Sequence, residues 1–284
     1  MPHRRYRLRL RAWRNIPASK PQRPRSRDRI APHATRSGRI DSPLDRRDTR
    51  GVNPEGPLER EVTEVIRTGD AASLQALLRE HPGLATARLG NPARRTLLHV
   101  VTDWPGHVPE AAAKIRALVA AGADVDARFT GPHSETPLNW AASCDDLDAL
   151  DALLDAGADI EAGGAVIGGG TPIADAVAFG QWKAARRLLD RGARTTLWQA
   201  AALGLLDRVR DELAGTESTQ EDLDNALWCA AHGGQRGTAE LLLERGADPA
   251  WVGHDELTAP AAAERSGAPE VAAWLRDEPP RRSP

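Results

Sequence analysis

The residue types best suited to chemistry are two cysteines, eight histidines, a glycine-rich segment and a run of aspartates. Cys229 and His232 have the C-x-x-H spacing of half a zinc site, but no second pair of ligands accompanies them. Cys144 and Cys229 are instead expected to be small buried side chains, too far apart for a disulfide. The chain has no Ser-His-Asp elbow, His-Glu-x-x-His pair or Gly-Lys-Ser/Thr sequence. We therefore expect a non-enzymatic protein without a metal or cofactor.

A glycine-rich segment, residues 163–170, stands just before Thr171, where a helix is expected to begin. Such a loop can hold a phosphate at a helix N-terminus. It lacks the Lys-Ser/Thr ending of a phosphate loop, however, and it follows no expected strand. The favoured interpretation is a short hairpin whose Val166 and Ile167 cover a neighbouring part of the fold.

Six aspartates between residues 145 and 159 form an acidic run, and the last four are spaced 3, 4 and 4 residues apart. That spacing places four carboxylates along one side of a helix. No glycine stands where a calcium-binding loop needs its turn. Such a run is usually a solvated helix face. The sharper hypothesis is a docking surface for a basic partner, including the chain's own N-terminal segment.

Charge is divided unevenly along the chain. Residues 1–50 carry 16 basic and four acidic side chains, whereas the remaining 234 residues carry 22 basic and 36 acidic ones. We expect residues 1–57 to be a disordered arginine-rich arm, and residues 279–284 a disordered tail, because their apolar residues are too sparse to offset the entropy of folding. Three interpretations of the arm stay open: contact with nucleic-acid phosphates or an acidic surface, a transit-like presequence, or a dispensable tail or segment ahead of the true start.

Hydropathy and cysteine usage indicate where the protein works. No stretch approaches 18 uninterrupted apolar residues, and the charged N-terminus lacks the apolar centre of a secretory signal. Two cysteines in a chain of 284 residues favour a reducing compartment. We expect a cytoplasmic protein without a membrane segment. The excess of Arg over Lys and the abundance of Ala favour a GC-rich, bacterial genome.

The elements that must position these residues emerge from comparing the chain with itself. A Thr-Pro-Leu type of opening, clearest at residues 136–138 and 171–173, alternates with a Leu-Leu…Gly-Ala-Asp type of ending. Gly122, Gly157 and Gly192 are each 35 residues apart. A period of this length indicates stacked helix pairs, which bury their apolar faces only against their neighbours. The opening Thr is expected to cap a helix whose first position is occupied by Pro.

These phrases resemble the ankyrin repeat, whose first helix opens on T-P-L-H-x-A and whose second helix leads into Gly-Ala-Asp and a β-hairpin finger. The resemblance covers residues 58–278 and implies an all-α solenoid of stacked helix-turn-helix units with short fingers. His99 keeps the family's histidine, which bonds backbone between repeats, and Asn139 replaces it in the next unit. We expect about seven units, beginning with a cap at 58–80 and continuing with openings near Thr96, Thr136, Thr171, Thr195, Asn225 and Thr258.

Two irregularities interrupt the repeat pattern. Residues 103–109 are inserted between the helices of the first clear repeat, and the step from Thr171 to Thr195 is too short for a finger. Tryptophan is also unusually abundant, with eight Trp against one Tyr and two Phe. Five of these are expected in the core: Trp140, Trp182, Trp198, Trp228 and Trp274. Trp104, on the insertion, and Trp251, on a finger, are candidates for partner contacts.

The resemblance also implies a function, because ankyrin repeats bind other proteins through a concave face made by finger tips and first helices. The variable positions of that face and the two Trp above give the predicted contacts: Trp104, His133, Glu135, Ser143, Phe179, Leu203, Asp222, Asp224, His232, Trp251 and Arg265. Their acidic lean favours a basic or polar protein surface. We expect a monomeric protein–protein interaction scaffold. The alternative is a nucleic-acid-associated protein that uses residues 1–57.

Overall fold

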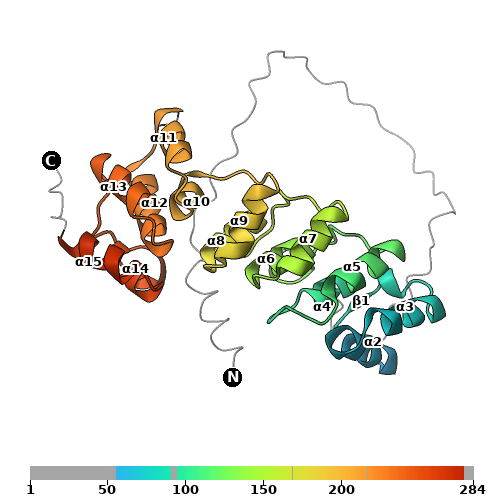
Figure 1. Ribbon diagram of the computed structural model, residues 1–284. Helices are drawn as coiled ribbons and strands as arrows, with labels where there is room; N and C mark the ends of the chain where they lie inside the picture. Colours follow the sequence, from blue (N-terminus) through green and yellow to red (C-terminus); the bar gives the residue numbers. More distant parts are fainter. Residues whose placement is uncertain (1–55, 91–94, 168, 216, 278–284) are drawn as a thin grey trace, which may run out of the picture.

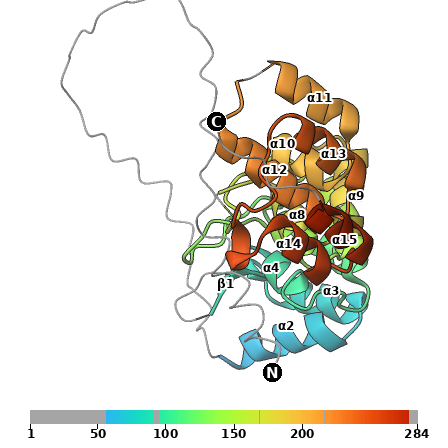
Figure 2. The ribbon, with the colours of Figure 1, turned by 90° about the vertical axis from the view of Figure 1, so that its left-hand side faces the viewer.

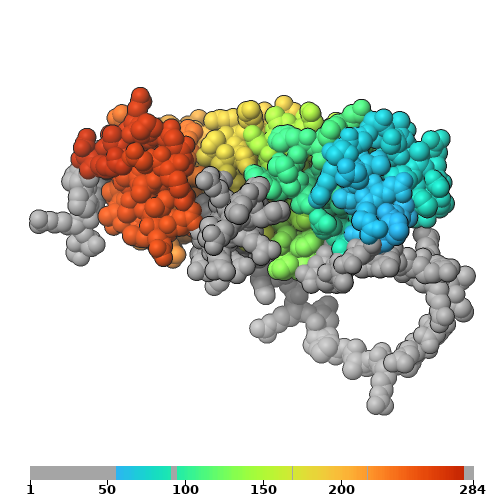
Figure 3. Space-filling model, turned by 90° about the horizontal axis from the view of Figure 1, so that it is seen from below, coloured from blue at the N-terminus to red at the C-terminus, as the bar shows by residue number. Residues whose placement is uncertain are grey.

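The computed structural model describes residues 56–277, except for 91–94, 168 and 216. The described residues form seven antiparallel helix pairs that stack side by side in chain order (Figure 1). This arrangement is the predicted solenoid of helix-turn-helix units. The space-filling view shows an elongated body with α2 and α3 at one end and α14 and α15 at the other (Figure 3). The expectations for the N-terminal arm and for residues 279–284 lie outside the described residues, apart from Gly56 and Pro57.

The helix pairs are α2 (Pro57–Thr68) and α3 (Ala71–Glu80), α4 (Leu97–Val101) and α5 (Ala111–Ala120), α6 (Pro137–Ser143) and α7 (Leu147–Asp155), α8 (Pro172–Ala178) and α9 (Trp182–Asp190), α10 (Leu197–Ala202) and α11 (Leu206–Gly215), α12 (Gln220–His232) and α13 (Arg236–Glu244), and α14 (Ala259–Arg265) and α15 (Pro269–Asp277). Two short strands, β1 (Arg88–Leu89) and β2 (Arg95–Thr96), pair antiparallel as the first finger. Single 3-10 turns occupy Leu84–Thr86 and His254–Glu256.

Threonines begin the first helices, as predicted. Thr136 Oγ1 accepts the N–H of Asn139 at 3.4 Å, and Asn139 Oδ1 accepts the N–H of Thr136 at 3.0 Å. This reciprocal arrangement satisfies two backbone donors that a helix start leaves open. Pro137 follows at the first helical position, where its missing N–H costs nothing.

One predicted helix start is wrong, and another lies one residue away. In the fifth pair the cap is Thr196, next to the predicted Thr195, with Gln199 as its partner. In the sixth pair α12 begins well before Asn225, because Thr219 and Asp222 form a capping box of their own. Asn225, the predicted start of this unit, therefore lies inside a helix of 13 residues.

The turn between α6 and α7 explains a departure from the repeat pattern. Asp145 stands there where other units have Gly180, Gly204 or Gly234, and it adopts the same left-handed conformation, with φ of 56°. Aspartate tolerates this region better than most residues do. Its Oδ1 also accepts the N–H of Ala184 at 2.7 Å, which ties the turn to the next unit.

A buried lysine joins the first two helix pairs. Lys114 on α5 is fully buried, and its Nζ donates to the carbonyl oxygens of Ile66 at 2.7 Å and Gly69 at 2.8 Å. These groups lie at the C-terminal end of α2, where a cation is favourable. Burial lowers the pKa of Lys114, while the charges of Glu110 and Asp70 oppose that shift. Lys114 therefore serves as a structural C-terminal cap.

The stack is interrupted between α9 and α10. Residues 191–196 connect these helices without a hairpin, as the short step predicted, and the buried apolar residues form two clusters, one mainly in α2–α9 and one in α10–α15. In addition, α10 packs closely on α12 but only lightly on α8. Figures 1 and 2 both show α11 projecting beyond the other helices. The two halves are consequently less tightly joined than neighbouring pairs within each half.

Candidate functional site

The histidine of the first clear repeat has the structural role that the resemblance implied. His99 is fully buried, with Nδ1 2.8 Å from Thr96 Oγ1 and Nε2 3.2 Å from the carbonyl oxygen of Glu135 in the next unit. Burial lowers the pKa of His99 to about 4, so the ring is neutral at physiological pH. In the next unit Asn139 instead donates to Asp175 Oδ2 at 3.0 Å.

Two buried residues with carboxyl groups, Glu135 and Asp175, contact His99 and Asn139 respectively. Glu135 accepts the Val166 N–H at 3.0 Å and the Trp140 indole N–H at 2.9 Å, and it lies 2.8 Å from His133 Nδ1. Asp175 has no exposed surface. Burial above all, and then the neighbouring Glu135, raise the pKa of Asp175 well above its ordinary value. Glu135, a predicted contact residue, is thus engaged within the fold.

Two of the aspartates between residues 145 and 159 pair with arginines of the following unit. Asp151 pairs with Arg187 and, at 3.0 Å, with Arg191, which also bonds Asp155 at 2.7 Å. Asp146 is buried and caps α7 through the N–H of Ala149 at 3.1 Å. Asp148, Asp155 and Asp159 are exposed, and a docking role for this face stays a prediction.

Cysteines and the glycine-rich segment have structural roles. Cys144 and Cys229 are buried free thiols, as predicted, and burial raises the pKa of Cys144 to about 12. Within the described residues no cluster of His, Cys, Asp and Glu suits a metal ion. In the segment 163–170 the N–H of Gly164 donates to the carbonyl of Gly169 at 2.9 Å, and Ile167 is buried. The segment is the predicted hairpin.

His254 is half-buried in the last finger, where it packs against α12. Its Nε2 lies 2.9 Å from Asn225 Oδ1, and its ring meets the Trp228 ring edge-on at 4.9 Å. Burial lowers the pKa of His254 to about 4. The cause is the long α12, which brings Asn225 and Trp228 against this finger.

The core prediction for tryptophan is right for one residue and holds in part for four. Trp228 is fully buried, and the other four are half-buried. Trp182, Trp198 and Trp274 pack against the apolar clusters, whereas Trp140 packs against the rings of His99 and Phe129. Trp104 exposes 38% of its surface on the insertion, and Trp251 is half-buried. A half-buried Trp packs one face while the other stays accessible, so burial alone does not separate core from contact residues.

The eleven predicted contact residues fall into three groups by exposure, and their role in binding stays a prediction. Exposed residues are Trp104, Asp222 and Arg265, and half-buried ones are His133 and Trp251. Buried residues are Glu135, Ser143, Phe179, Leu203, Asp224 and His232. Two more of the buried set have internal partners: Ser143 donates to the carbonyl of Trp140 at 3.0 Å, and Asp224 accepts the Asp248 N–H at 2.6 Å.

Three of these residues, from three different helix pairs, line one pocket of about 350 Å³. They are Phe179, at the end of α8, His232, at the end of α12, and Arg265, at the end of α14. His232 Nδ1 lies 2.6 Å from Ser266 Oγ, which is also in the lining. The complete lining is Ala178, Phe179, Gly180, Gln181, Trp182, His232, Asp255, Arg265 and Ser266.

Trp182, Asp255 and Ser266 are pocket residues that the repeat columns do not mark. The Trp182 ring packs 5.2 Å from the His232 ring, and a Cβ at Gly180 would lie 3.7 Å from His232. The pocket therefore forms where the turn after α8 meets the end of α12, two helix pairs further along the chain. That meeting takes place across the interruption of the stack. The short step from Thr171 to Thr195 predicts the interruption but not which helix ends come together there.

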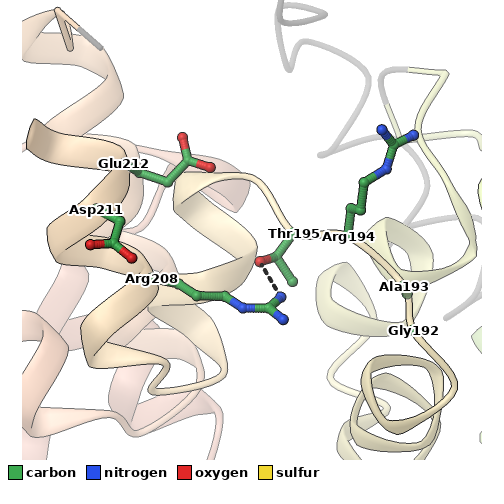
Figure 4. A pocket seen from close by; sticks show the side chains of 7 residues that line it. All are labelled: Gly192, Ala193, Arg194, Thr195, Arg208, Asp211 and Glu212. Carbon is green, nitrogen blue, oxygen red and sulfur yellow. Dashed lines mark hydrogen bonds between the residues drawn. The ribbon is translucent and has the colours of Figure 1, made fainter. Parts of the chain in front are cut away.

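A second hollow, of about 450 Å³, lies at the interruption itself (Figure 4). Arg208 of α11 extends across it, and its Nη1 donates to Thr195 Oγ1 at 3.2 Å. Asp211 and Glu212 stand on the same helix, whereas Arg194 projects from the connecting segment. The lining mixes both charges, and its side chains come from α11 and from the segment that replaces a finger.

Comparisons with known proteins agree with this architecture. Residues 133–162 and 222–253 each match a family model described as ankyrin repeat. A search of curated proteins found no match. Among solved structures, the human ASB11 ankyrin repeat domain is 22% identical, and the match covers 80% of this chain and 100% of that one with a TM-score of 0.46. In the part of the chain that the structure describes, every helix is too short or too polar to cross a bilayer. The two matched segments and the stacked helix pairs identify the fold as an ankyrin-repeat solenoid.

Proposed function

We propose that this protein is a non-enzymatic scaffold that binds another protein through its concave face. Ankyrin repeats are generally protein–protein interaction modules, and the family is generally non-catalytic. The observation that carries the proposal is the convergence of Phe179, His232 and Arg265 on one pocket. Each was selected from a variable column of a different unit. The exposed Trp104 adds a large apolar side chain of the kind enriched at binding hot spots.

The proposal includes a monomeric protein in the cytoplasm. The two buried free thiols fit a reducing compartment. Ion pairs such as those of Asp151 with Arg187 and Arg191 occupy part of the outer surface. Partner contacts are therefore assigned to the finger side, to the first helices and to the insertion that carries Trp104.

Site-specific photocrosslinking tests which face binds. A photoreactive amino acid is placed at Trp104 or Asp222 on the proposed face, and at Arg186 or Glu240 on the outer helices as matched exposed controls. In lysate of the source cells, we expect a crosslinked protein from the first pair of positions only. Equal crosslinking from the outer positions, or none from any position, would contradict the proposal.

Calorimetry with the purified crosslinked partner then measures the contribution of Trp104. Trp104→Ala should weaken binding by about 1–2 kcal/mol, the range of a moderate hot spot. The melting temperature should change little, because this side chain is exposed. A binding constant equal to that of the wild type would remove Trp104 from the interface.

A further inference from the structure

Arg265 is held in place at the mouth of the pocket lined by Phe179 and His232. Its Nη1 forms an ion pair with Asp255, and the centre of its guanidinium lies 5.9 Å from the Trp228 ring. Its side chain is nevertheless 41% exposed. A guanidinium carries five N–H groups in a planar fork, so donors remain after Asp255 has accepted from one nitrogen. The side chain is therefore pre-organised, which lowers the entropic cost of using it to bind a ligand.

The charges of the lining decide which ligand fits. Asp255 and Arg265 are the only carboxylate and the only guanidinium among the lining residues. The two charges neutralise each other, but the Asp255 side chain is only 20% exposed and so offers little to an entering cation, whereas Arg265 is 41% exposed. An anion would find the remaining N–H groups of Arg265 and, close by, the hydroxyl of Ser266. Hydrogen bonds between guanidinium and carboxylate are among the strongest that side chains form.

The volume and the apolar walls of the pocket further restrict which ligands fit. A volume of about 350 Å³ admits one side chain or a chain end, not a folded element. Phe179 and Trp182 supply apolar surface beside the charged rim, against which the methylene groups of a bound residue can pack. Both features suit a carboxyl group on a short aliphatic stem.

We propose that this pocket binds a carboxylate of the partner protein, supplied by an Asp or Glu side chain or by the C-terminus. This inference rests on the proposed scaffold function and gives it a recognition chemistry. It also revises, for this part of the face, the sequence-based expectation of a basic partner surface.

Peptide titration of the ¹⁵N-labelled full chain tests the pocket directly. The probes are acetylated tripeptides: Gly-Glu-Gly amide, Gly-Gln-Gly amide, and Gly-Gly-Gly with a free C-terminus. The signal is the indole N–H resonance of Trp182, assigned with Trp182→Phe. We expect saturable shifts with the Glu probe or the free C-terminus, and none with the Gln probe. The tighter of the two carboxylate probes identifies the source of the group.

Arg265→Gln should weaken carboxylate binding by about tenfold or more, the effect of losing a charge-assisted hydrogen bond. Arg276→Gln is the matched control, because Arg276 is an exposed arginine that pairs with Glu264 away from the pocket. No saturable shift with either carboxylate, or equal shifts with the Gln probe, would overturn the proposal. If Arg265→Gln still binds the crosslinked partner as tightly as the wild type, the pocket proposal fails while the scaffold proposal stands.

Discussion

At the scale of single residues, one column shows how the chain meets the same requirement in different ways. His99 bonds both its own cap, Thr96, and the backbone of the next unit. Asn139 likewise bonds its own cap residue, Thr136. Its bond to the next unit, however, goes to the carboxyl group of Asp175. The repeat pattern predicts the cap. It does not predict the raised pKa of Asp175, because this follows from complete burial beside Glu135.

Asp175→Asn should stabilise the protein at alkaline pH. The folded-state pKa of Asp175 is raised above an unfolded value near 3.9, so the folded state holds the proton more tightly. Stability is therefore greatest below the unfolded pKa and is lost as pH rises towards the folded pKa. Asn remains neutral, can donate to Glu135, and can accept from Asn139. We expect the free energy of unfolding to increase by about 1–3 kcal/mol at pH 8, because the substitution removes the penalty of a poorly hydrogen-bonded buried group.

The measurement is urea unfolding of the wild type and Asp175→Asn at pH 5 and pH 8. The variant's advantage should grow with pH. Asp148→Asn, at an exposed position of α7, is the control and should show no such growth. An advantage that is the same at both pH values would exclude a proton on Asp175.

At the scale of the elements, the repeat pattern predicts most helix starts but not all of them. Thr96, Thr136, Thr171 and Thr258 occupy the N-cap position of first helices as predicted, whereas α12 begins after Thr219 and not at Asn225. The reason is local, because Thr219 finds a capping partner in Asp222, three residues on. The candidate site was predictable residue by residue through Phe179, His232 and Arg265. The assembly of these residues into one pocket was not predictable, because it depends on how the end of α8 packs against the end of α12.

Thr136→Ala should cost more stability than Thr219→Ala. Both substitutions remove the hydroxyl of a capping box, an effect of about 0.5–2 kcal/mol. Thr136 is fully buried, so its partner Asn139 cannot turn to water instead, whereas Thr219 is exposed. Urea midpoints of the two variants measure the difference. An equal loss would mean that burial adds nothing to these caps.

At the scale of the whole molecule, the interruption at residues 191–196 divides one solenoid into two cores. Stability of a repeat protein is approximately a sum of unit terms and neighbour terms. The light packing of α8 on α10 makes one neighbour term small. The two halves should therefore respond separately to damage in either core.

Leu242→Ala tests this independence. Leu242 is fully buried in the cluster of α10–α15, and the loss should be about 2–5 kcal/mol. Hydrogen exchange should accelerate in α12–α15 and stay unchanged in α4–α7. Leu153→Ala, fully buried in the other cluster, should give the mirror image. Acceleration in both halves from either variant would show a single cooperative unit.

Under the proposed binding along the fingers, the interruption would also select partners by shape. Within the described part of the chain, fingers stand before α4, α6 and α8, none stands before α10 or α12, and one stands before α14. A straight, rigid partner that follows the first three fingers runs out of contacts at the gap. Reaching the fourth finger takes a partner that bends or that carries two separate epitopes. The spacing of the fingers thus acts as a geometric filter, and it operates before any side chain is recognised.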